Sequence, residues 1–453
     1  MALALIGLAA FAALALDGGN LYTEQRRAQA AADNSVMAAA YAQMNGVTVN
    51  PDPNICRNTI QPSDCHLANA AFDNAAQNGY TAGPATKVVF HLPPIDGAYA
   101  GNSHYMEVVI TQLVPTALAH LFYQQDPIPL TVIAVAHGSP TGPIMPGYAL
   151  AAMKPDCSGT NGTMYIQGNG GGSSGGTNLT DGGVFVNATC ANALNMTGNN
   201  DFIYTDGPHI DIAGTSYSGV DCTAPGVPNN CNFYPAPTTN ATQAPQDPLA
   251  NTPASTAPDC SQLPQRSVPN SNPAIVQPGQ YTSLDAGQQH DMIMQPGIYC
   301  LTGGQLSGGK SITGTGVLIY LVDVGAKVNF SGNGILDLRA PVAGDGNGCS
   351  GLTDTSHDIC KYLGILIYKT SGNNDCLNNQ ASDDIDFSGS ASMNIIGLIY
   401  APKSLMQYAG QGNLTMTGQA IVGCVKFNGN GNLNIIYNPN ATYSPPPSVR
   451  LDQ

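Results

Sequence analysis

The sequence opens on a run of sixteen residues, MALALIGLAAFAALAL, that contains no charged side chain. Ala and Leu favour helix, and a helix without a polar face must be buried in lipid or in protein. At about 1.5 Å per residue the run extends about 24 Å. This is slightly short of the roughly 30 Å that a spanning helix of about 20 residues covers. The predicted assembly and anchor residues of this helix are Leu3, Leu5, Ile6, Leu8, Phe11, Leu14, Leu16, Asp17, Tyr22, Arg26 and Arg27.

The helical pattern continues beyond the apolar run. From Tyr22 to Met44 the sequence is rich in Ala and amphipathic, with polar residues such as Glu24 and apolar residues such as Val36. Asn45-Gly46 is a typical helix stop. We therefore predict one helix over residues 1–46, which acts either as a membrane anchor or as the core helix of a pilin-like filament.

Residues 47–140 predict a small β-β-α-β module. A loop tied by Cys56 and Cys65 comes first, and patterns of alternating apolar residues and of Ala-rich helix follow. The expected elements, in chain order, are a short helix over 66–77, strands over 87–92 and 105–111, a helix over 115–123 and a strand over 130–136.

From about residue 147 the sequence consists of short strand-like segments separated by Gly, Asn and Ser. Phe-Ser-Gly or Phe-Asn-Gly recurs at Phe330, Phe387 and Phe427, and Ile-Tyr recurs at the ends of several apolar segments. Rungs of roughly twenty residues predict a parallel β-helix over residues 147–440, with a β-sandwich as the alternative. In such a coil Val, Ile, Leu and the recurring Phe residues point inward. The fold class is thus multidomain α+β.

Two segments depart from this pattern of short strand-like segments. Residues 222–279 are rich in Pro, Thr, Asn and Ala and predict an irregular insertion between rungs, tethered by its cysteines. Residues 441–453 contain Pro445, Pro446 and Pro447 and predict an extended tail that could reach a neighbouring subunit.

The cysteines indicate an oxidising compartment. They number twelve and include no Cys-x-x-Cys pair, so zinc clusters and thioredoxin-like chemistry lose their usual spacing. Several lie close together in loops and predict local disulfides, above all Cys56 with Cys65, Cys222 with Cys231, and Cys349 with Cys360. The full set of disulfide candidates is Cys56, Cys65, Cys157, Cys190, Cys222, Cys231, Cys260, Cys300, Cys349, Cys360, Cys376 and Cys424.

Asn-x-Ser/Thr sequons also fit export, although a sequence rich in Asn and Thr produces such triplets by chance. The candidate glycosylation sites are Asn161, Asn178, Asn187, Asn195, Asn240, Asn329, Asn413 and Asn440.

The N-terminal pattern A-L-D-G-G-N-L-Y-x-x-x-R-R-x-Q-x-A-A-D, from Ala15 to Asp33, resembles the TadE/TadG-like family of tight-adherence (Flp-type) pilus-assembly proteins. The segments Y-M-E-V-V-I-T-Q-L-V-P-T-A-L-A-H-L and L-T-V-I-A-V-A resemble the region that follows the helix in that family. The stretch from Gly297 to Leu321 is similar to its C-terminal part. The chain has Leu5 where processed pilins carry Glu, so we expect assembly through apolar packing and through Asp17, Arg26 and Arg27. In place of the von Willebrand type A domain of many relatives, we expect the β-solenoid.

No motif of the sequence predicts an enzyme. Asp383, Asp384 and Asp386 are the best catalytic or calcium-binding candidates, but the basic residues that accompany the carboxylates of β-helix lyases are missing. Asp386-x-Ser-x-Ser lacks the strand and helix of a metal-adhesion site, and Gly304–Ser311 lacks the helix of a phosphate-binding loop. The Gly/Ser run 168–176 is not followed by a helical pattern either. His91, His104, His120 and His137 are unevenly spaced and predict packing or surface roles. We expect no cofactor, and calcium has no further support.

The charge composition of the chain limits the classes of partner that it can bind. Only 9% of residues are charged, Lys and Arg together number 14, and the net charge is −15. Because binding to a phosphate backbone needs clustered cations, we expect no nucleic-acid partner. The resemblance implies a structural subunit of an extracellular or cell-surface pilus, with copies of itself or other pilin-like subunits as partners and passage through the cytoplasmic membrane by the N-terminal helix. The alternatives are an anchored monomeric adhesin or pilus-assembly accessory, which would bind a glycan or a cell-surface target, and a β-helix enzyme acting on polysaccharide.

Overall fold

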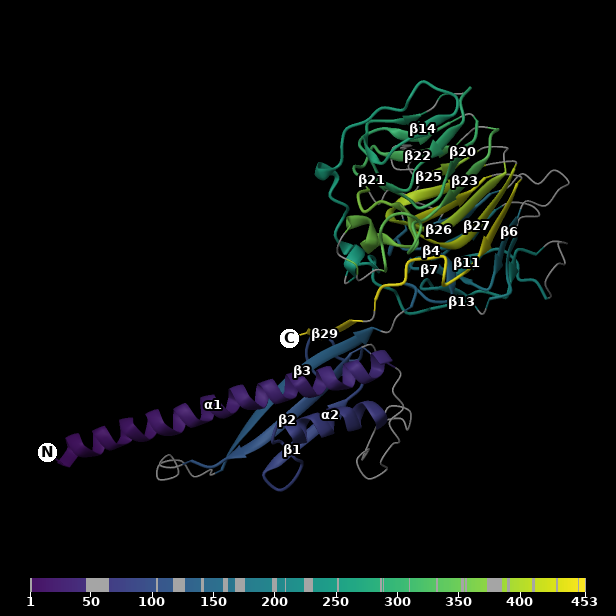
Figure 1. The fold of residues 1–453 in the computed structure, drawn as a ribbon. Helices are drawn as coiled ribbons and strands as arrows, with labels where there is room; N and C mark the ends of the chain where they lie inside the picture. The colour runs from purple at the N-terminus through teal and green to yellow at the C-terminus, as the bar shows by residue number, and fades with distance from the viewer. Residues whose placement is uncertain are drawn as a thin grey trace. The chain divides into compact units, whose positions relative to one another are not determined.

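The computed structural model divides into two compact units, both drawn in Figure 1. Unit 1 comprises Met1–Thr141 and Pro446–Gln453, and unit 2 comprises Gly142–Pro445. The chain therefore leaves unit 1, builds unit 2 and returns. The structure describes residues 2–45 (up to residue 14 the helical backbone alone), 65–102, 105–116, 127–139, 142–157, 162–167, 176–197, 202–207, 209–223, 231–250, 252–285, 287, 289–308, 310–330, 333–351, 354, 357–372, 385–388, 392–409, 412–428, 431–446 and 448–452.

Unit 1 packs helices on an antiparallel sheet. The four-stranded sheet has the order β1-β2-β3-β29. The first helix is continuous, as predicted for residues 1–46. The elements are α1 (Ala2–Asn45), α2 (Cys65–Gln77), β1 (Thr86–His91), β2 (Met106–Val114), β3 (Ile128–Ser139) and β29 (Ser448–Asp452).

The predicted short helix and the predicted strands of this module correspond to α2, β1, β2 and β3. The helix predicted over 115–123 lies almost entirely outside the described residues, as does Cys56 of the predicted tied loop.

The prediction of an extended tail over residues 441–453 was wrong. β29 pairs with β3 from Ser448 opposite Ser139 to Asp452 opposite Val135, and so adds an edge strand to its own module. Val449 and Leu451 pack against the core of unit 1. The local sequence did not show this because the partner strand lies about 300 residues earlier in the chain.

Unit 2 is built from parallel strands. They form one 25-stranded sheet, and each pairing described within it is parallel. Through most of the sheet a strand pairs with the strand three places later, so successive strands alternate between three ladders. This arrangement is β-helix-like and differs from a β-sandwich, whose sheets are antiparallel.

Two long strands, β26 (Met393–Tyr408) and β27 (Asn413–Phe427), pass through all three ladders. Ladder 1 also contains β14 (Ala274–Val276), β17 (Met292–Met294), β20 (Ile312–Gly314), β23 (Leu336–Arg339), β28 (Asn432–Ile436), β6 (Gly176–Thr180), β9 (Phe202–Thr205) and β12 (Phe233–Tyr234). Ladder 2 contains β15 (Gly279–Tyr281), β18 (Gly297–Leu301), β21 (Val317–Leu321), β24 (Ile365–Tyr368), β4 (Tyr148–Ala152), β7 (Gly183–Val186), β10 (Ile210–Ile212) and β13 (Thr238–Thr239). Ladder 3 contains β16 (Leu284–Asp285), β19 (Gln305–Ser307), β22 (Lys327–Phe330), β25 (Ile385–Phe387), β5 (Met164–Ile166), β8 (Leu194–Met196) and β11 (Tyr217–Ser218).

The order of these strands in space differs from their order in the chain. β27 pairs with β26 on one side and with β4 and β5 on the other, so the first strands of unit 2 stack onto its last ones. The two ends of the stack are formed by β14–β16 and by β11–β13, and Figure 1 shows β14 and β13 at opposite ends. The connection from β13 to β14 must therefore run the length of the stack.

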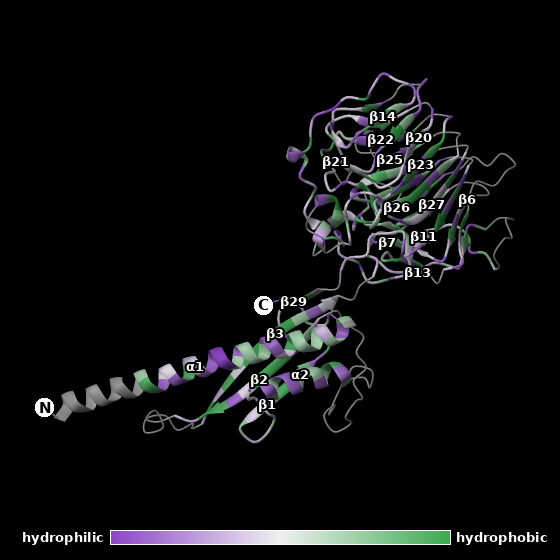
Figure 2. Ribbon diagram, viewed as in Figure 1, coloured by the Kyte–Doolittle hydropathy of each residue, from purple (hydrophilic) through white to green (hydrophobic). Residues whose placement is uncertain are grey.

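The interior of the stack is apolar, as expected from the alternation of side chains along a strand. Phe330, Phe387, Tyr408 and Phe427 occupy matching positions in ladder 3, and all are buried. This agrees with the inward position predicted for the recurring Phe residues. Figure 2 shows the hydrophobic colour along strands such as β23, β26 and β27.

We call the connection between β13 and β14, residues 240–273, the strap. Its residues Leu249 and Ala254 are buried against the outer side of ladder 2, in one apolar cluster with Tyr368 and Tyr400. The prediction of an irregular insertion over 222–279 was therefore wrong in two respects. That range includes strands of the ladders, and its middle part covers the stack instead of projecting from it. Two short 3-10 helices, Pro253–Ser255 and Cys260–Gln262, lie in the strap, and a third, Asp358–Tyr362, lies after β23.

Tyrosine hydroxyls fix the backbone of the strap. Tyr368 donates to the carbonyl of Ala254 at 2.8 Å, and Tyr362 donates to that of Thr256 at 2.5 Å. The hydroxyls of Tyr400 and Tyr443 each accept a backbone N–H of the strap at 3.3 Å, from Leu249 and Ala254 respectively. The strap thus satisfies backbone groups that it buries, which an apolar cover alone would leave unpaired.

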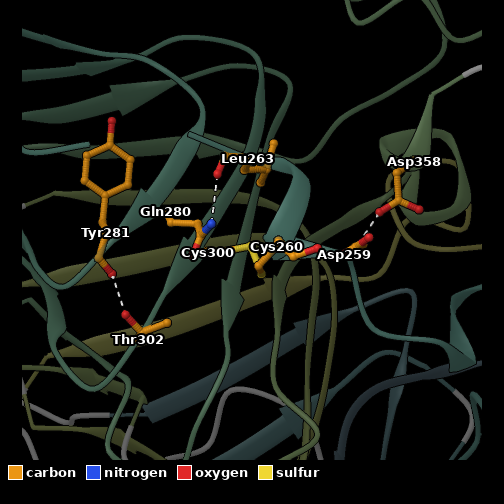
Figure 3. Close-up of a disulfide and its surroundings, with 9 residues drawn as sticks. Asp259, Cys260, Leu263, Gln280, Tyr281, Cys300, Thr302 and Asp358 are labelled. Atoms are coloured by element: carbon orange, nitrogen blue, oxygen red, sulfur yellow. Dashed lines mark hydrogen bonds between the residues drawn. A yellow bond between two sulfur atoms is a disulfide. The ribbon is translucent and has the colours of Figure 1, made fainter. Parts of the chain in front are cut away.

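A disulfide between Cys260 and Cys300 fastens the strap to β18 (Figure 3). Close to it, the Gln280 side chain donates to the carbonyl of Leu263 at 2.8 Å, and the N–H of Asp259 donates to Asp358 at 3.2 Å. These contacts place the end of the strap beside β15.

Candidate functional site: helix α1 and the module that holds it

The C-terminal half of α1 docks on the sheet of unit 1. Its buried residues recur every three or four positions, which is the period of one helix face. They pack with Val108, Ile110 and Ala134 of β2 and β3 and with Ala68 and Ala71 of α2. The docked face of α1 is Ala28, Ala31, Ala32, Ser35, Val36, Ala39 and Ala40.

Gly138 of β3 sets the distance between helix and sheet. A Cβ atom at this position would lie 2.1 Å from the carbonyl oxygen of Ala40. The N–H of Gly138 donates to the Oε1 of Gln43 of α1 at 3.4 Å, which also joins the strand to the helix. The absence of a side chain is therefore what allows α1 to approach β3 so closely.

We expect Gly138→Ala to destabilise unit 1 by about 3 kcal/mol, since the added methyl group meets backbone that cannot rotate away. Denaturant unfolding of the full chain, followed by a probe in unit 1, measures the loss. Gly83→Ala, also in unit 1, is the matched control, because a Cβ atom there would come no closer than 3.9 Å to another atom, the carbonyl oxygen of Thr81. Equal stability of the two variants would contradict the close-approach argument.

Polar contacts fix the register of the docked half. The Gln29 amide donates to the carbonyl of Ile133 at 3.0 Å, and Tyr80, which follows α2, donates to Glu24 at 3.3 Å. Burial and the neighbouring Glu24 carboxylate raise the pKa of Tyr80 to about 12. The hydroxyl therefore stays protonated and holds α1 at neutral pH.

Toward its N-terminus, α1 continues past the sheet (Figure 1). Leu16 is 63% exposed and Tyr22 is 61% exposed, and Arg26 and Arg27 are exposed as well, whereas Asp17 is buried. Arg27 lies 3.8 Å from Glu24, and Arg26 lies over the ring of Tyr22. The predicted residues Leu3, Leu5, Ile6, Leu8, Phe11 and Leu14 lie where the structure describes the helical backbone alone.

The hydropathy of α1 changes along its length, and Figure 2 shows a hydrophilic band in its middle. Among the described residues, no helix is both long and apolar enough to cross a membrane.

The C-terminal strand is held by a polar cluster that the sequence did not reveal. The Nδ1 of His137 lies 2.9 Å from Asp452, and Arg450 contacts the same carboxylate at 2.8 Å. The ring of Tyr105 lies against His137, and burial followed by Asp452 raises the pKa of Tyr105. These groups hold the C-terminal strand β29 against β3.

His91 has a comparable structural role. It lies 3.8 Å from Glu107, a carboxylate buried on β2, and burial raises the pKa of Glu107. His104 and His120 lie outside the described residues. The part of the chain that the structure describes contains no group of three His, Cys, Asp or Glu side chains suited to a metal ion.

The disulfides agree in part with the predicted local pairs. Cys222–Cys231 and Cys349–Cys360 are formed as predicted. Cys157–Cys190 and Cys260–Cys300 join segments further apart, which spacing alone did not indicate. Cys65 and Cys424 are also disulfide-bonded, and Cys56 and Cys376 lie outside the described residues.

The candidate glycosylation sites differ in exposure. Asn240, Asn413 and Asn440 are exposed, and Asn178 and Asn329 are half-buried. Asn187 and Asn195 are buried, and the Asn187 amide donates to the carbonyls of Met153 and Ala244, so the folded structure has no room for a glycan on it. Asn161 lies outside the described residues.

The remaining motif candidates that the structure describes lie in or beside ladder strands. Asp386 is the outward residue of β25 and accepts a hydrogen bond from Ser388, while Asp383 and Asp384 lie outside the described residues. Gly304–Ser311 contains β19, and β20 follows it, so the helix that a phosphate-binding loop needs is not formed there. The run 168–176 lies outside the description except for Gly176, which begins β6.

Comparison with known proteins relates the N-terminal helix to pilus-assembly proteins. Residues 1–43 match the model of the putative Flp pilus-assembly TadE/G-like family, a range that almost coincides with α1. A structural alignment with the competence-associated pilin ComZ from Thermus thermophilus covers 93% of this chain and 98% of that one, at a TM-score of 0.27 and 9% sequence identity, and carries no argument about the fold. No curated protein matches the chain significantly. The resemblance to the TadE/TadG-like family that the sequence predicted is thereby confirmed for residues 1–43.

Proposed function

We propose that the chain is a structural subunit of an extracellular pilus or surface filament, assembled through α1 with copies of itself or with other pilin-like subunits. The observation that carries this proposal is the division of α1 into two parts. Its buried face begins at Ala28, whereas the described side chains from Ala15 to Arg27 are mostly exposed, and the pilus-assembly match covers the same helix. A helix that projects apolar side chains from a folded module has to bury them against another helix or a membrane.

The rest of the molecule supports an extracellular location. Disulfides persist in oxidising compartments and are rare in the cytosol. We infer that the three ladders form a parallel β-helix, displayed on the surface of the filament, and that α1 passes through the cytoplasmic membrane before assembly.

Leu16→Glu tests the proposal. The side chain is 63% exposed, so we expect the melting temperature to remain within about 2 °C of the wild type. Because a carboxylate would have to be buried in an apolar helix contact, we expect fibres on the cell surface to be lost. Electron cryo-microscopy of material sheared from cells measures this, with Gln25→Glu as the control at another exposed position of α1.

A wild-type chain that is absent from sheared fibres, and that detergent extracts as a monomer, would overturn the filament proposal. That result would favour an anchored adhesin or a pilus-assembly accessory instead.

A further inference from the structure

We propose that a cleft at one end of unit 2 binds a carboxylate-bearing saccharide. The cleft has a volume of about 540 Å³, within the usual range of ligand sites. It lies where the last part of the strap meets the first strands of the stack, β14 and β15. The described residues that line it are Gln265, Arg266, Ser267, Pro269, Ile275, Gln277 and Tyr281.

One wall of the cleft is a fixed edge strand. Gln265 bridges to Gln280 of β15 in parallel, the N–H of Arg266 donates to the carbonyl of Gln280 at 2.8 Å, and the N–H of Gln280 donates to Pro264 at 2.9 Å. The Cys260–Cys300 disulfide and the Gln280 side chain hold the chain just before this point (Figure 3). The wall is therefore preorganised by contacts that a ligand does not have to supply.

Contacts of the Arg266 side chain with the backbone of Pro278 and Gly279 hold it in place. Its Nε donates to the carbonyl of Pro278 at 3.0 Å, and no described residue forms a hydrogen bond with its terminal nitrogens. A Cβ atom on Gly279 would lie 2.8 Å from the Cδ of Arg266, so the stem lies directly on the backbone of β15. The guanidinium group thus faces the cleft with donors in a geometry that fits a carboxylate.

The other residues that line the cleft favour a sugar as the ligand. Gln265, Gln277 and Ser267 offer amide and hydroxyl groups that pair with sugar hydroxyls. Ile275 is 50% exposed and, with Pro269, gives an apolar patch for the C–H face of a pyranose ring. The described lining contains no carboxylate to repel an acid, although the whole chain has a net charge of −15. An anion is therefore bound by local contact with Arg266 and not by the field of the protein.

Binding of labelled oligogalacturonate to the purified full chain tests the inference, with the fully methyl-esterified oligomer as the matched neutral ligand. We expect the acidic oligomer to bind at least ten-fold more tightly than the ester. Because a hydrogen bond to a charged group contributes about 1.5–3 kcal/mol, Arg266→Gln should weaken binding of the acid roughly ten- to hundred-fold and leave binding of the ester unchanged. Gly279→Ala, which displaces the Arg266 stem, should weaken it as well.

Arg339→Gln is the control, since Arg339 is exposed like Arg266 and lies on β23, away from the cleft. The melting temperature of each variant shows that it is folded. Equal affinity for the acid and the ester would overturn the proposal. So would full binding by a folded Arg266→Gln variant, or an equal loss in Arg339→Gln. The experiment uses isolated chains, so its outcome does not depend on whether the chain assembles into filaments.

Discussion

Above the ordinary tyrosine pKa of 10.0, unit 2 should lose stability steeply and unfold cooperatively. The buried hydroxyls that hold the strap are the cause. Burial raises the pKa of Tyr362, Tyr368, Tyr400 and Tyr443 in the folded state, and the neighbouring Asp247 raises that of Tyr400 further. An ionised phenol can neither donate to a strap carbonyl nor remain buried without a counter-charge.

The direction follows from proton linkage. Below pH 10 these tyrosines are protonated in both states and the stability is complete. Above it the unfolded chain loses protons that the folded chain keeps, so the free energy of unfolding falls as the pH rises toward the folded pKa values. Each such tyrosine lowers the free energy of unfolding by about 1.4 kcal/mol per pH unit, and the four together lower it by about 5.5 kcal/mol per pH unit.

Tyrosinate absorbance and circular dichroism, recorded together across an alkaline titration, measure this. Both signals should change in one transition at a pH above 10. Tyr368→Phe should make the pH dependence shallower by about one proton, and it should cost about 1 kcal/mol at neutral pH through the lost bond to Ala254. Tyr41→Phe, at a mostly exposed site of α1, should leave the transition unchanged. Titration of the buried tyrosines before any loss of structure would refute the argument.

Removing the Cys260–Cys300 disulfide by the double substitution C260A/C300A should destabilise unit 2 by about 4 kcal/mol. The bond closes a loop with a sequence separation of 40, and the entropy that a crosslink removes from the unfolded chain grows with the length of the loop. The end of the strap, which forms a wall of the proposed saccharide cleft, should also become accessible to protease.

The comparison variant is C222A/C231A, whose loop has a separation of only 9 and for which the same relation gives about 2.5 kcal/mol. Guanidinium unfolding gives the two free energies, and limited proteolysis followed by mass spectrometry locates the cleavage. If the strap of C260A/C300A is cut no faster than that of the wild type, the disulfide does not hold it, and the tyrosine contacts suffice.

The local sequence pattern was sufficient to predict much of unit 1, because each of its helices and strands depends on residues close together in the chain. The Ala-rich period of α1 and the alternation in β1, β2 and β3 are visible in the sequence, and so is the family resemblance of residues 1–43. Composition and cysteine spacing likewise predicted disulfides between Cys222 and Cys231 and between Cys349 and Cys360. The inward position of the recurring Phe residues followed from strand alternation alone.

The saccharide cleft and the strap had no comparable local signal. The Ile-Tyr repeats were visible, but which face of ladder 2 their tyrosines occupy depends on what covers that face. Arg266 is an ordinary residue in a Pro-rich segment until the strap brings it onto Gly279.

The sequence by itself thus determined the helix, the strands and the apolar alternation, since each depends on the preferences of neighbouring residues. Only the tertiary structure decided that β27 lies between β26 and β4, that the strap must run back along ladder 2, and that β29 completes the sheet of unit 1. Parallel strands and edge strands pair through backbone N–H and C=O groups that every residue except proline carries, so their partners are selected by burial and chain closure and not by local sequence.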